Sequence, residues 1–130
     1  MCGIFALLNN KNNFSNTFIK KNFCKGVDRG PESSSLINVN NKITLGFHRL
    51  AINGLDDISD QPLTVNKVTL ICNGEIYNYK KLYQYLNITP KTNSDCEVII
   101  HLYLRYGMEQ TLRMLDGVFA FVLYLSLIHI

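Results

Sequence analysis

The second residue of the chain is a cysteine followed by a glycine, and this start could carry nucleophilic chemistry. A thiol attacks as the thiolate, so the cysteine needs a base nearby to take its proton. If Met1 is removed, as the small Cys2 permits, Cys2 carries both the thiol and the free α-amine of the chain, which can accept the proton. In isolation, a cysteine at this position is also compatible with no chemical role.

Three polar sites beside apolar segments could complete a site around such a nucleophile. Arg49 ends an apolar run, where its planar guanidinium suits a carboxylate ligand or a structural salt bridge. Asn73 and Gly74 place a side-chain amide beside a backbone N–H, which are oxyanion-hole donors unless the pair is a plain turn. Asp95, after Ser94, either binds an ammonium group or belongs to a helix cap. Together these groups fit an α-amino acid that carries a side-chain amide.

The remaining cysteines and histidines give no sign of a metal site, and we predict none. Cys24, Cys72 and Cys96 form no C-x-x-C pair and have no histidine at zinc-finger spacing. We interpret them as small buried hydrophobic residues, with a structural disulfide protein as the weakest alternative. His48 is interpreted as structural and His101 as lying on a helix face.

The elements that must position these residues follow from hydrophobic periodicity and turn residues. Their order fits a mixed α/β or α+β sandwich. Before the Asn73-Gly74 pair we expect a strand over 1–8, a helix over 14–27, a hairpin of 36–39 with 43–47, a loop over 54–62 and a strand over 68–72. After it we expect a helix over 75–86, a helix from 94 to near Gly107, a short helix over 110–115 and a strand over 118–124.

Composition limits the class of protein. The 130 residues are 47% hydrophobic and 18% charged, which favours one domain with a packed interior and excludes intrinsic disorder. The net charge of +3 is too small to indicate nucleic-acid or membrane-surface binding. The sequence contains neither an apolar run of membrane-spanning length nor a secretory signal, so we expect a cytoplasmic protein.

Seven short motifs in a fixed order carry a resemblance to a known family. The motifs are MCGIFA (1–6), RGPE (29–32), GFHRLA (46–51), QPL (61–63), NGEIYN (73–78), SDCEVII (94–100) and LDGVFAF (115–121). With these motifs the sequence resembles the N-terminal glutaminase domain of glutamine-hydrolysing asparagine synthetases, and the resemblance covers residues 1 to 124. Related class II amidotransferases share the Cys2-Gly3-Ile4 start and the Asn73-Gly74 pair.

The resemblance implies a fold and a role for each site residue. The fold would be α+β, the four-layer αββα sandwich of N-terminal nucleophile hydrolases. Cys2 would attack the γ-carboxamide of glutamine, and the thioester would be hydrolysed to glutamate with release of ammonia. Asn73 and Gly74 would hold the oxyanion. The substrate-binding residues would be Arg49 for the α-carboxylate, Asp95 with Glu75 for the ammonium, and the backbone of Leu50, Ala51, Ile52 and Asn53 along the pocket wall.

The resemblance also implies parts beyond these residues. In the family, ammonia passes to a second domain that uses ATP and Mg²⁺ to activate aspartate, so we expect no cofactor in this chain itself. The complete enzyme could form a homodimer. The fold would be incomplete at the C-terminus, and we hypothesise that residues 125–130, which match nothing in the family, are artefactual. Two departures are Asp28, where the family has histidine, and Asn53, where it has an apolar residue.

Two alternatives to a glutaminase of this family stay open. One is another class II amidotransferase, which would carry a different run after Asn73-Gly74. The other is a non-catalytic fragment that binds glutamine without turning it over, because missing strands would leave open sheet edges.

Overall fold

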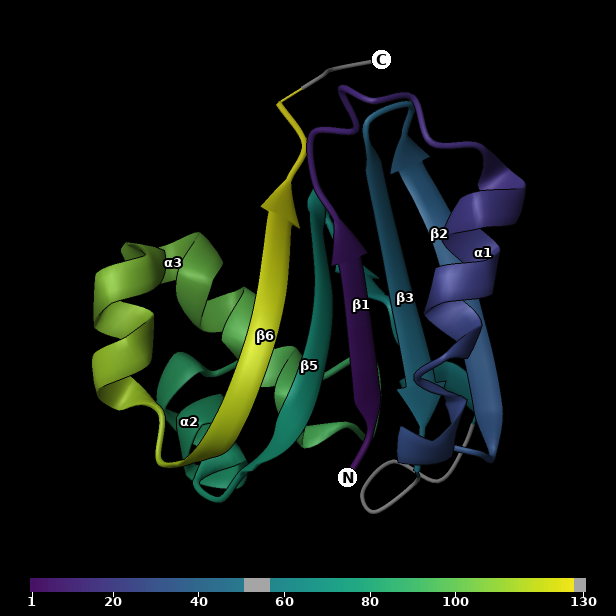
Figure 1. Ribbon diagram of the computed structural model, residues 1–130. Helices are drawn as coiled ribbons and strands as arrows, with labels where there is room; N and C mark the ends of the chain where they lie inside the picture. Colours follow the sequence, from purple (N-terminus) through teal and green to yellow (C-terminus); the bar gives the residue numbers. More distant parts are fainter. Residues whose placement is uncertain (51–56, 128–130) are drawn as a thin grey trace.

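The computed structural model describes residues 1–50 and 57–127. Two three-stranded antiparallel sheets form its centre, with strand orders β1-β3-β2 and β4-β5-β6 (Figure 1). The strands and helices are β1 (Gly3–Leu7), α1 (Asn16–Cys24), β2 (Ser33–Asn40), β3 (Ile43–Arg49), β4 (Leu63–Val65), β5 (Val68–Ile76), α2 (Tyr79–Leu86), α3 (Val98–Met114) and β6 (Gly117–Leu125). Short 3₁₀ turns are η1 (Val27–Arg29), η2 (Asp57–Ser59) and η3 (Asp95–Glu97).

The first sheet is centred on β3, whose side chains alternate between two faces. On the inner face, Phe47 packs in one cluster with Ile71 of β5. On the outer face, Gly46 and His48 meet α1, where the Phe23 ring stacks on the His48 ring with centroids 4.0 Å apart. A Cβ at Gly46 would lie only 2.6 Å from the Phe23 ring, so glycine here lets α1 approach the sheet closely.

The second sheet turns one face to the first sheet and the other to α2 and α3. Ile71 lies on the inner face, whereas Leu70, Cys72 and Ile76 pack with Ile99 of α3 in the larger core cluster. The order of layers is therefore helix, sheet, sheet, helices, as Figure 1 shows. The α+β prediction is confirmed, and the layers are compatible with the predicted αββα sandwich.

β5 is longer than its sequence indicates, and this corrects one prediction. We expected the strand to end at Cys72 and a helix to begin at Glu75, but β5 runs to Ile76 and α2 begins at Tyr79. Asn73-Gly74 is thus not a turn, because its residues continue the antiparallel pairing with β6. The short β4 was also not expected from the sequence.

The chain after β5 follows the expected order more closely. α3 begins behind η3, where the Ser94 side chain caps the turn by accepting from the Cys96 N–H. The predicted break at Gly107 is confirmed, since this residue has φ 80° and ψ 176°, but the chain resumes the helix at once and continues to Met114. β6 ends at Leu125, and residues 128–130 lie outside the described part, so the hypothesis about 125–130 stays a prediction.

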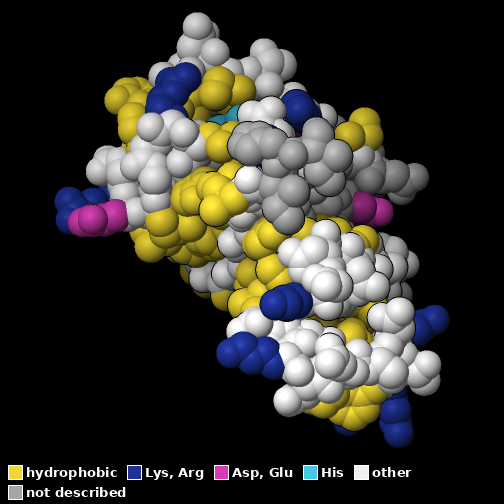
Figure 2. All heavy atoms as spheres, turned by 90° about the horizontal axis from the view of Figure 1, so that it is seen from above, with side chains coloured by type: hydrophobic (Ala, Val, Ile, Leu, Met, Phe, Trp, Pro, Cys, Tyr) yellow, Lys and Arg dark blue, Asp and Glu magenta, His cyan; other side chains and the backbone are white. Residues whose placement is uncertain are grey.

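One face of the molecule shows how charged and apolar side chains are distributed on it (Figure 2). None of the helices within the described ranges is long and apolar enough to cross a membrane. On the face shown in Figure 2, Lys and Arg side chains are scattered, with hydrophobic side chains exposed between them. This pattern agrees with the small net charge of +3.

Candidate active site

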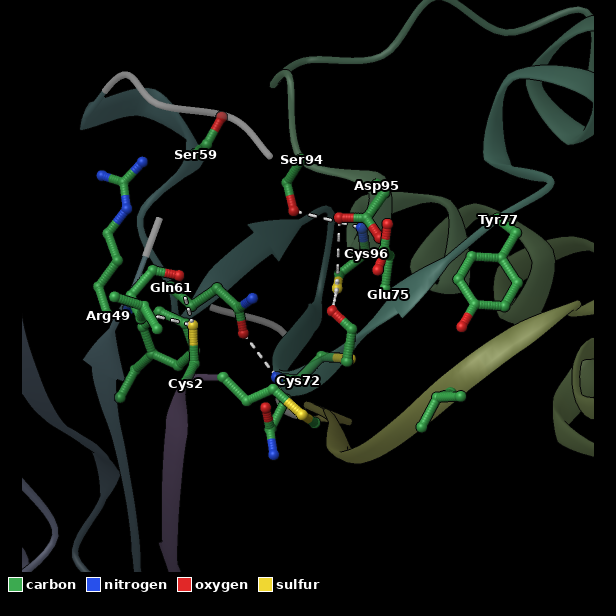
Figure 3. A pocket seen from close by; sticks show the side chains of 16 residues that line it. Cys2, Arg49, Ser59, Gln61, Cys72, Glu75, Tyr77, Ser94, Asp95 and Cys96 are labelled. Atoms are coloured by element: carbon green, nitrogen blue, oxygen red, sulfur yellow. Dashed lines mark hydrogen bonds between the residues drawn. The ribbon is translucent and has the colours of Figure 1, made fainter. Parts of the chain in front are cut away.

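A pocket of about 250 Å³ opens where the start of β1, the end of β3 and the second half of β5 meet η3 (Figure 3). These four segments are far apart in the sequence, and the two sheets bring them to one end of the sandwich. The pocket is lined by Met1, Cys2, Phe47, Arg49, Leu50, Ser59, Gln61, Cys72, Asn73, Gly74, Glu75, Tyr77, Ser94, Asp95, Cys96 and Val118.

The Cys2 thiol is held against the backbone that follows β3. The register pairs Gly3 with His48, which brings the preceding residue, Cys2, beside the end of β3. Its Sγ donates to the Leu50 carbonyl oxygen at 3.2 Å and accepts from the Leu50 N–H at 3.3 Å. The side chain is half-buried, so its sulfur is both oriented by the peptide and open to the pocket.

The edge of β5 that faces away from β6 builds the opposite wall. Along a strand, backbone groups of alternate residues point to the same side. The N–H of Tyr77 is accepted by the Asp116 carbonyl before β6, so odd-numbered residues of β5 bond toward β6. The even-numbered residues therefore bond toward β4. β4 covers only the start of this edge, because its three pairs end at Leu63 with Leu70.

Beyond β4, side chains replace the missing strand at two of three positions. The Cys72 N–H is accepted by Gln61 Oε1 at 2.5 Å, and the Ile76 N–H by Asp95 Oδ2 at 2.6 Å. Gly74 lies between them, and among the described residues no acceptor is paired with its N–H on this side. Among the described residues, the Gly74 N–H is therefore a backbone donor left available on this edge of β5, inside the pocket.

Asn73 adds a side chain with unused hydrogen-bonding capacity. It lies on the same face of β5 as Ile71 and Glu75, toward the first sheet and Cys2. Its Oδ1 is fully buried and has no hydrogen-bond partner among the described residues. A buried polar atom without a partner costs folding free energy, so such groups are typical of sites that a ligand completes.

Asp95 is a buried carboxylate fixed in place by β5. It is 4% exposed, and the Ile76 N–H holds one of its oxygens. Glu75, in contrast, is exposed at the pocket rim. Two acidic side chains thus approach the pocket on the side of η3, as Figure 3 shows.

Behind Asp95, a second buried carboxylate organises the loop before η3. Glu97 accepts from the N–H groups of Lys91 and Thr92 at 2.9 and 2.7 Å, and is bonded to His101 Nε2 at 2.7 Å. Burial opposes its ionisation, but the hydrogen bonds from His101 and the Lys91 N–H outweigh that effect and lower the pKa of Glu97 to about 2. His101 lies on a helix face as expected, although its pairing with Glu97 was not predicted.

The opposite side of the pocket carries the positive charge. Arg49 is 8% exposed and forms an ion pair with Asp60. Ser59 lies next to that acid, and its Oγ accepts from the Asn93 N–H at 3.1 Å, which ties η2 to the loop before η3. Cationic and anionic groups therefore lie on different sides of one pocket, as a zwitterionic ligand requires.

Of the other cysteines, Cys72 and Cys96 are buried, as interpreted from the sequence, but the prediction is wrong for Cys24. Cys24 is exposed because α1 turns Ile19 and Phe23, not Cys24, toward the sheet. All four cysteines are free, which is contrary to a structural disulfide protein. The neighbouring Cys72 thiol and burial raise the pKa of the Cys96 thiol, so it stays protonated at neutral pH. His48 is bonded to the Phe23 carbonyl oxygen and to Ser34 Oγ. Within residues 1–50 and 57–127, no three His, Cys, Asp or Glu side chains gather in a group that could hold a metal ion.

A comparison with known protein families agrees with this geometry. Residues 1–127 match the family model described as glutamine amidotransferase domain. The chain belongs to this family. The matched range includes every described residue that lines the pocket.

Similar proteins include the asparagine synthetases (glutamine-hydrolysing) of Homo sapiens, Gallus gallus and Mus musculus. Each is 43% identical to this chain over 129 residues, an alignment that covers 95% of the chain and 22% of the relative. The chain therefore spans 22% of the length of these curated relatives.

In this glutamine amidotransferase domain, the pocket unites most of the residues selected from the sequence. Cys2, Arg49, Leu50, Asn73, Gly74, Glu75 and Asp95 all line it. Ala51, Ile52 and Asn53 lie outside the described residues, so their predicted place in the wall stays a prediction. Ser59, Gln61 and Tyr77 also line the pocket, although no local sequence pattern indicated a site role for them; Gln61 belongs to the QPL motif.

Proposed function

We propose that this domain hydrolyses glutamine to glutamate and ammonia through a thioester on Cys2. The observation that carries the proposal is the available Gly74 N–H in the same pocket as the Cys2 thiol. A thiol nucleophile facing a free backbone donor supports acyl transfer, in which charge develops on a carbonyl oxygen. Arg49 and Asp95, on different sides of that pocket, suit the carboxylate and ammonium groups of an amino acid.

The chemistry requires that Met1 be removed. Met1 occupies part of the pocket wall, and its carbonyl makes the Cys2 nitrogen a non-basic amide. Once Met1 is lost, the α-amine accepts the thiol proton as sulfur attacks the side-chain carboxamide carbon (Cδ) of glutamine. The C–N bond then breaks, and the α-ammonium returns the proton to the leaving ammonia. Water hydrolyses the thioester and restores the thiol.

Each remaining group of the pocket has a defined task in this proposal. The Asn73 amide and the Gly74 N–H stabilise the tetrahedral oxyanion. Arg49 binds the α-carboxylate of glutamine, which either replaces Asp60 as the ion-pair partner of Arg49 or shares the guanidinium with it. Asp95, supported by Glu75, binds the α-ammonium. The fold is that of the N-terminal nucleophile hydrolases.

We further propose that the ammonia serves asparagine synthesis, in keeping with the name of the similar proteins. In that setting ATP, Mg²⁺ and aspartate would act in a synthetase domain outside these residues, and the complete enzyme would work in the cytoplasm as a monomer or a homodimer. The alternative is another class II amidotransferase, which would transfer the ammonia to a different acceptor. Testing which acceptor the complete enzyme amidates, aspartate or another compound, would distinguish the two.

The test is ammonia release from glutamine by the chain with Cys2 as its first residue, confirmed by mass spectrometry. Cys2→Ala should lower the rate of ammonia release by at least about a thousandfold, because it removes the nucleophile. Cys24→Ala is the matched control, since Cys24 is an exposed thiol outside the pocket. Chain that retains Met1 should be folded and inactive.

Three outcomes would contradict the proposal. Activity in Cys2→Ala would exclude the nucleophile, and full activity with Met1 attached would exclude the α-amine as the base. Binding of glutamine without any turnover would favour the non-catalytic fragment instead.

A further inference from the structure

Gln61 is a buried pocket residue whose role the proposed mechanism leaves open. It is 6% exposed and lies just before β4, next to the Gln61–Pro62 cis peptide. Its Oε1 accepts the Cys72 N–H at 2.5 Å, in the position that a backbone carbonyl of β4 would hold if that strand were longer.

This bond decides which way the amide of Gln61 faces. A backbone N–H can be accepted only by the carbonyl oxygen of a side-chain amide, because the NH₂ group has no acceptor lone pair to offer. The oxygen must therefore face Cys72, and the NH₂ group must face the other way. No acceptor for that NH₂ is present among the described residues, and the side chain lines the pocket. Gln61 thus offers the pocket a donor in a fixed orientation.

The neighbours of Gln61 indicate which end of the ligand this donor would meet. The preceding residue, Asp60, is the ion-pair partner of Arg49, so this segment lies on the cationic side of the pocket. Figure 3 places Gln61 on the side of Arg49 and Cys2, away from Asp95 and Glu75. An NH₂ donor cannot bind an ammonium group, whereas it can bind a carboxylate.

We propose that Gln61 is a substrate-binding residue whose amide nitrogen donates to the α-carboxylate of glutamine beside Arg49. This inference rests on the proposed glutaminase function. It assigns Gln61 two bonds: one to β5, which fixes the orientation of the amide, and one to the substrate, which selects for a carboxylate at that position.

Two substitutions separate binding from a purely structural role. Gln61→Glu keeps an oxygen for the Cys72 N–H but replaces the donor by a second acceptor. Gln61→Met keeps the length of the side chain and loses both bonds. We expect Gln61→Glu to raise KM for glutamine by about tenfold or more, and to raise it further than Gln61→Met, with kcat within about threefold of the parent chain.

A structural role predicts the reverse order. Gln61→Glu would then resemble the parent chain, and Gln61→Met would lose both stability and activity, because only the latter leaves the buried Cys72 N–H without an acceptor. A KM for Gln61→Glu within about twofold of the parent value would overturn the proposal. Thermal unfolding of each variant shows whether it is folded.

A substrate analogue tests the same contact without a charged variant. The analogue is glutamine with its α-carboxylate converted to a carboxamide, compared as a substrate with glutamine itself. Replacing glutamine by the analogue should lower kcat/KM by a larger factor in the parent chain than in Gln61→Met. The same factor in both proteins would overturn the proposal, and this comparison does not depend on whether Gln61→Glu folds. If the parent chain hydrolyses neither compound, the glutaminase function fails, which is a different result from failure of the Gln61 contact.

Discussion

The two edges of β5 differ in how their backbone groups are bonded, and the difference separates structure from chemistry. Toward β6, the pairing is continuous over nine residues, from Val68 with Leu125 to Ile76 with Gly117. Toward β4, it lasts three residues, and side chains of Gln61 and Asp95 take over. One strand thereby has a closed edge and an open edge.

The pairing with β6 on the closed edge fixes the position and direction of the backbone groups on the open edge. A Cβ at Gly74 would lie 2.6 Å from the Phe119 Cα, so β6 approaches the backbone there as closely as glycine allows. Such close pairing fixes the direction of the Gly74 N–H without any contact on the open side. A donor held in advance of the reaction stabilises a developing charge better than one that must reorient.

Replacement of Asn73 should produce the largest effect on activity among the substitutions that test the two edges of β5. We expect Asn73→Ala to lower kcat about 100- to 1,000-fold, because an oxyanion donor is lost. Stability should be unchanged or higher, since Oδ1 is buried without a partner. Ammonia release and thermal unfolding measure the two quantities.

Asn78 provides the matched control for that comparison. Its amide is bonded at both ends, by donation to the Met114 carbonyl oxygen and acceptance from the Asp116 N–H. Asn78→Ala should therefore lose stability while the kcat of the folded fraction stays near the parent value. If Asn73→Ala destabilises the chain as much as Asn78→Ala does, the Asn73 amide is held by the fold and is not a group that awaits a ligand.

Replacement of Glu97 should test how firmly the open edge is supported from behind. The folded pKa of about 2 lies below the ordinary value for a glutamate, so its charge stabilises the fold at neutral pH, and that stabilisation is lost as the pH falls from about 5 toward 2. We expect Glu97→Gln to cost on the order of 3 kcal/mol at pH 7, with the gap to the parent chain closing at low pH.

Urea unfolding of both proteins between pH 7 and pH 3 measures that difference. Groups that do not contact Glu97 titrate alike in the two proteins, so the difference between the curves reports Glu97 together with His101, which is bonded to it. A gap that stays constant with pH would show that the carboxylate is not held in its charged form.

The smallest effect is expected at the far end of the sandwich. Tyr124 of β6 accepts a hydrogen bond from Asn40 Nδ2 at 3.1 Å, which links the two sheets away from the pocket. Tyr124→Phe should cost about 1 kcal/mol of unfolding free energy and leave KM and kcat unchanged. A change in KM would mean that the closed edge transmits strain to the pocket.

The chemical groups of the site could be predicted from the sequence because they lie in short, ordered motifs. The resemblance selected Cys2, Arg49, Asn73, Gly74 and Asp95, and all of them line one pocket. The order of elements and the α+β class also followed from local periodicity and turn residues.

The features that sequence reasoning missed depend on contacts between distant segments. The helical spacing of Ile76, Tyr79 and Leu82 favours a helix that begins at Glu75, but pairing with β6, some forty residues later, keeps Glu75 and Ile76 extended. The Gln61 side chain accepts the Cys72 N–H only because β4 ends at Leu63, and no local sequence pattern predicts where a strand loses its neighbour in the sheet.

The extended backbone at Asn73-Gly74 also bears on how the site ages. An Asn-Gly sequence loses its amide when the glycine nitrogen folds back onto the asparagine side-chain carbonyl and closes a succinimide ring. In β5 the pairing of Asn73 with Ala120 and of Gly74 with Phe119 holds the chain straight and keeps those atoms apart. Each unfolding event removes that protection and exposes the amide to conversion into a carboxylate. The chemical lifetime of the oxyanion donor is therefore set by the stability of the β5–β6 ladder.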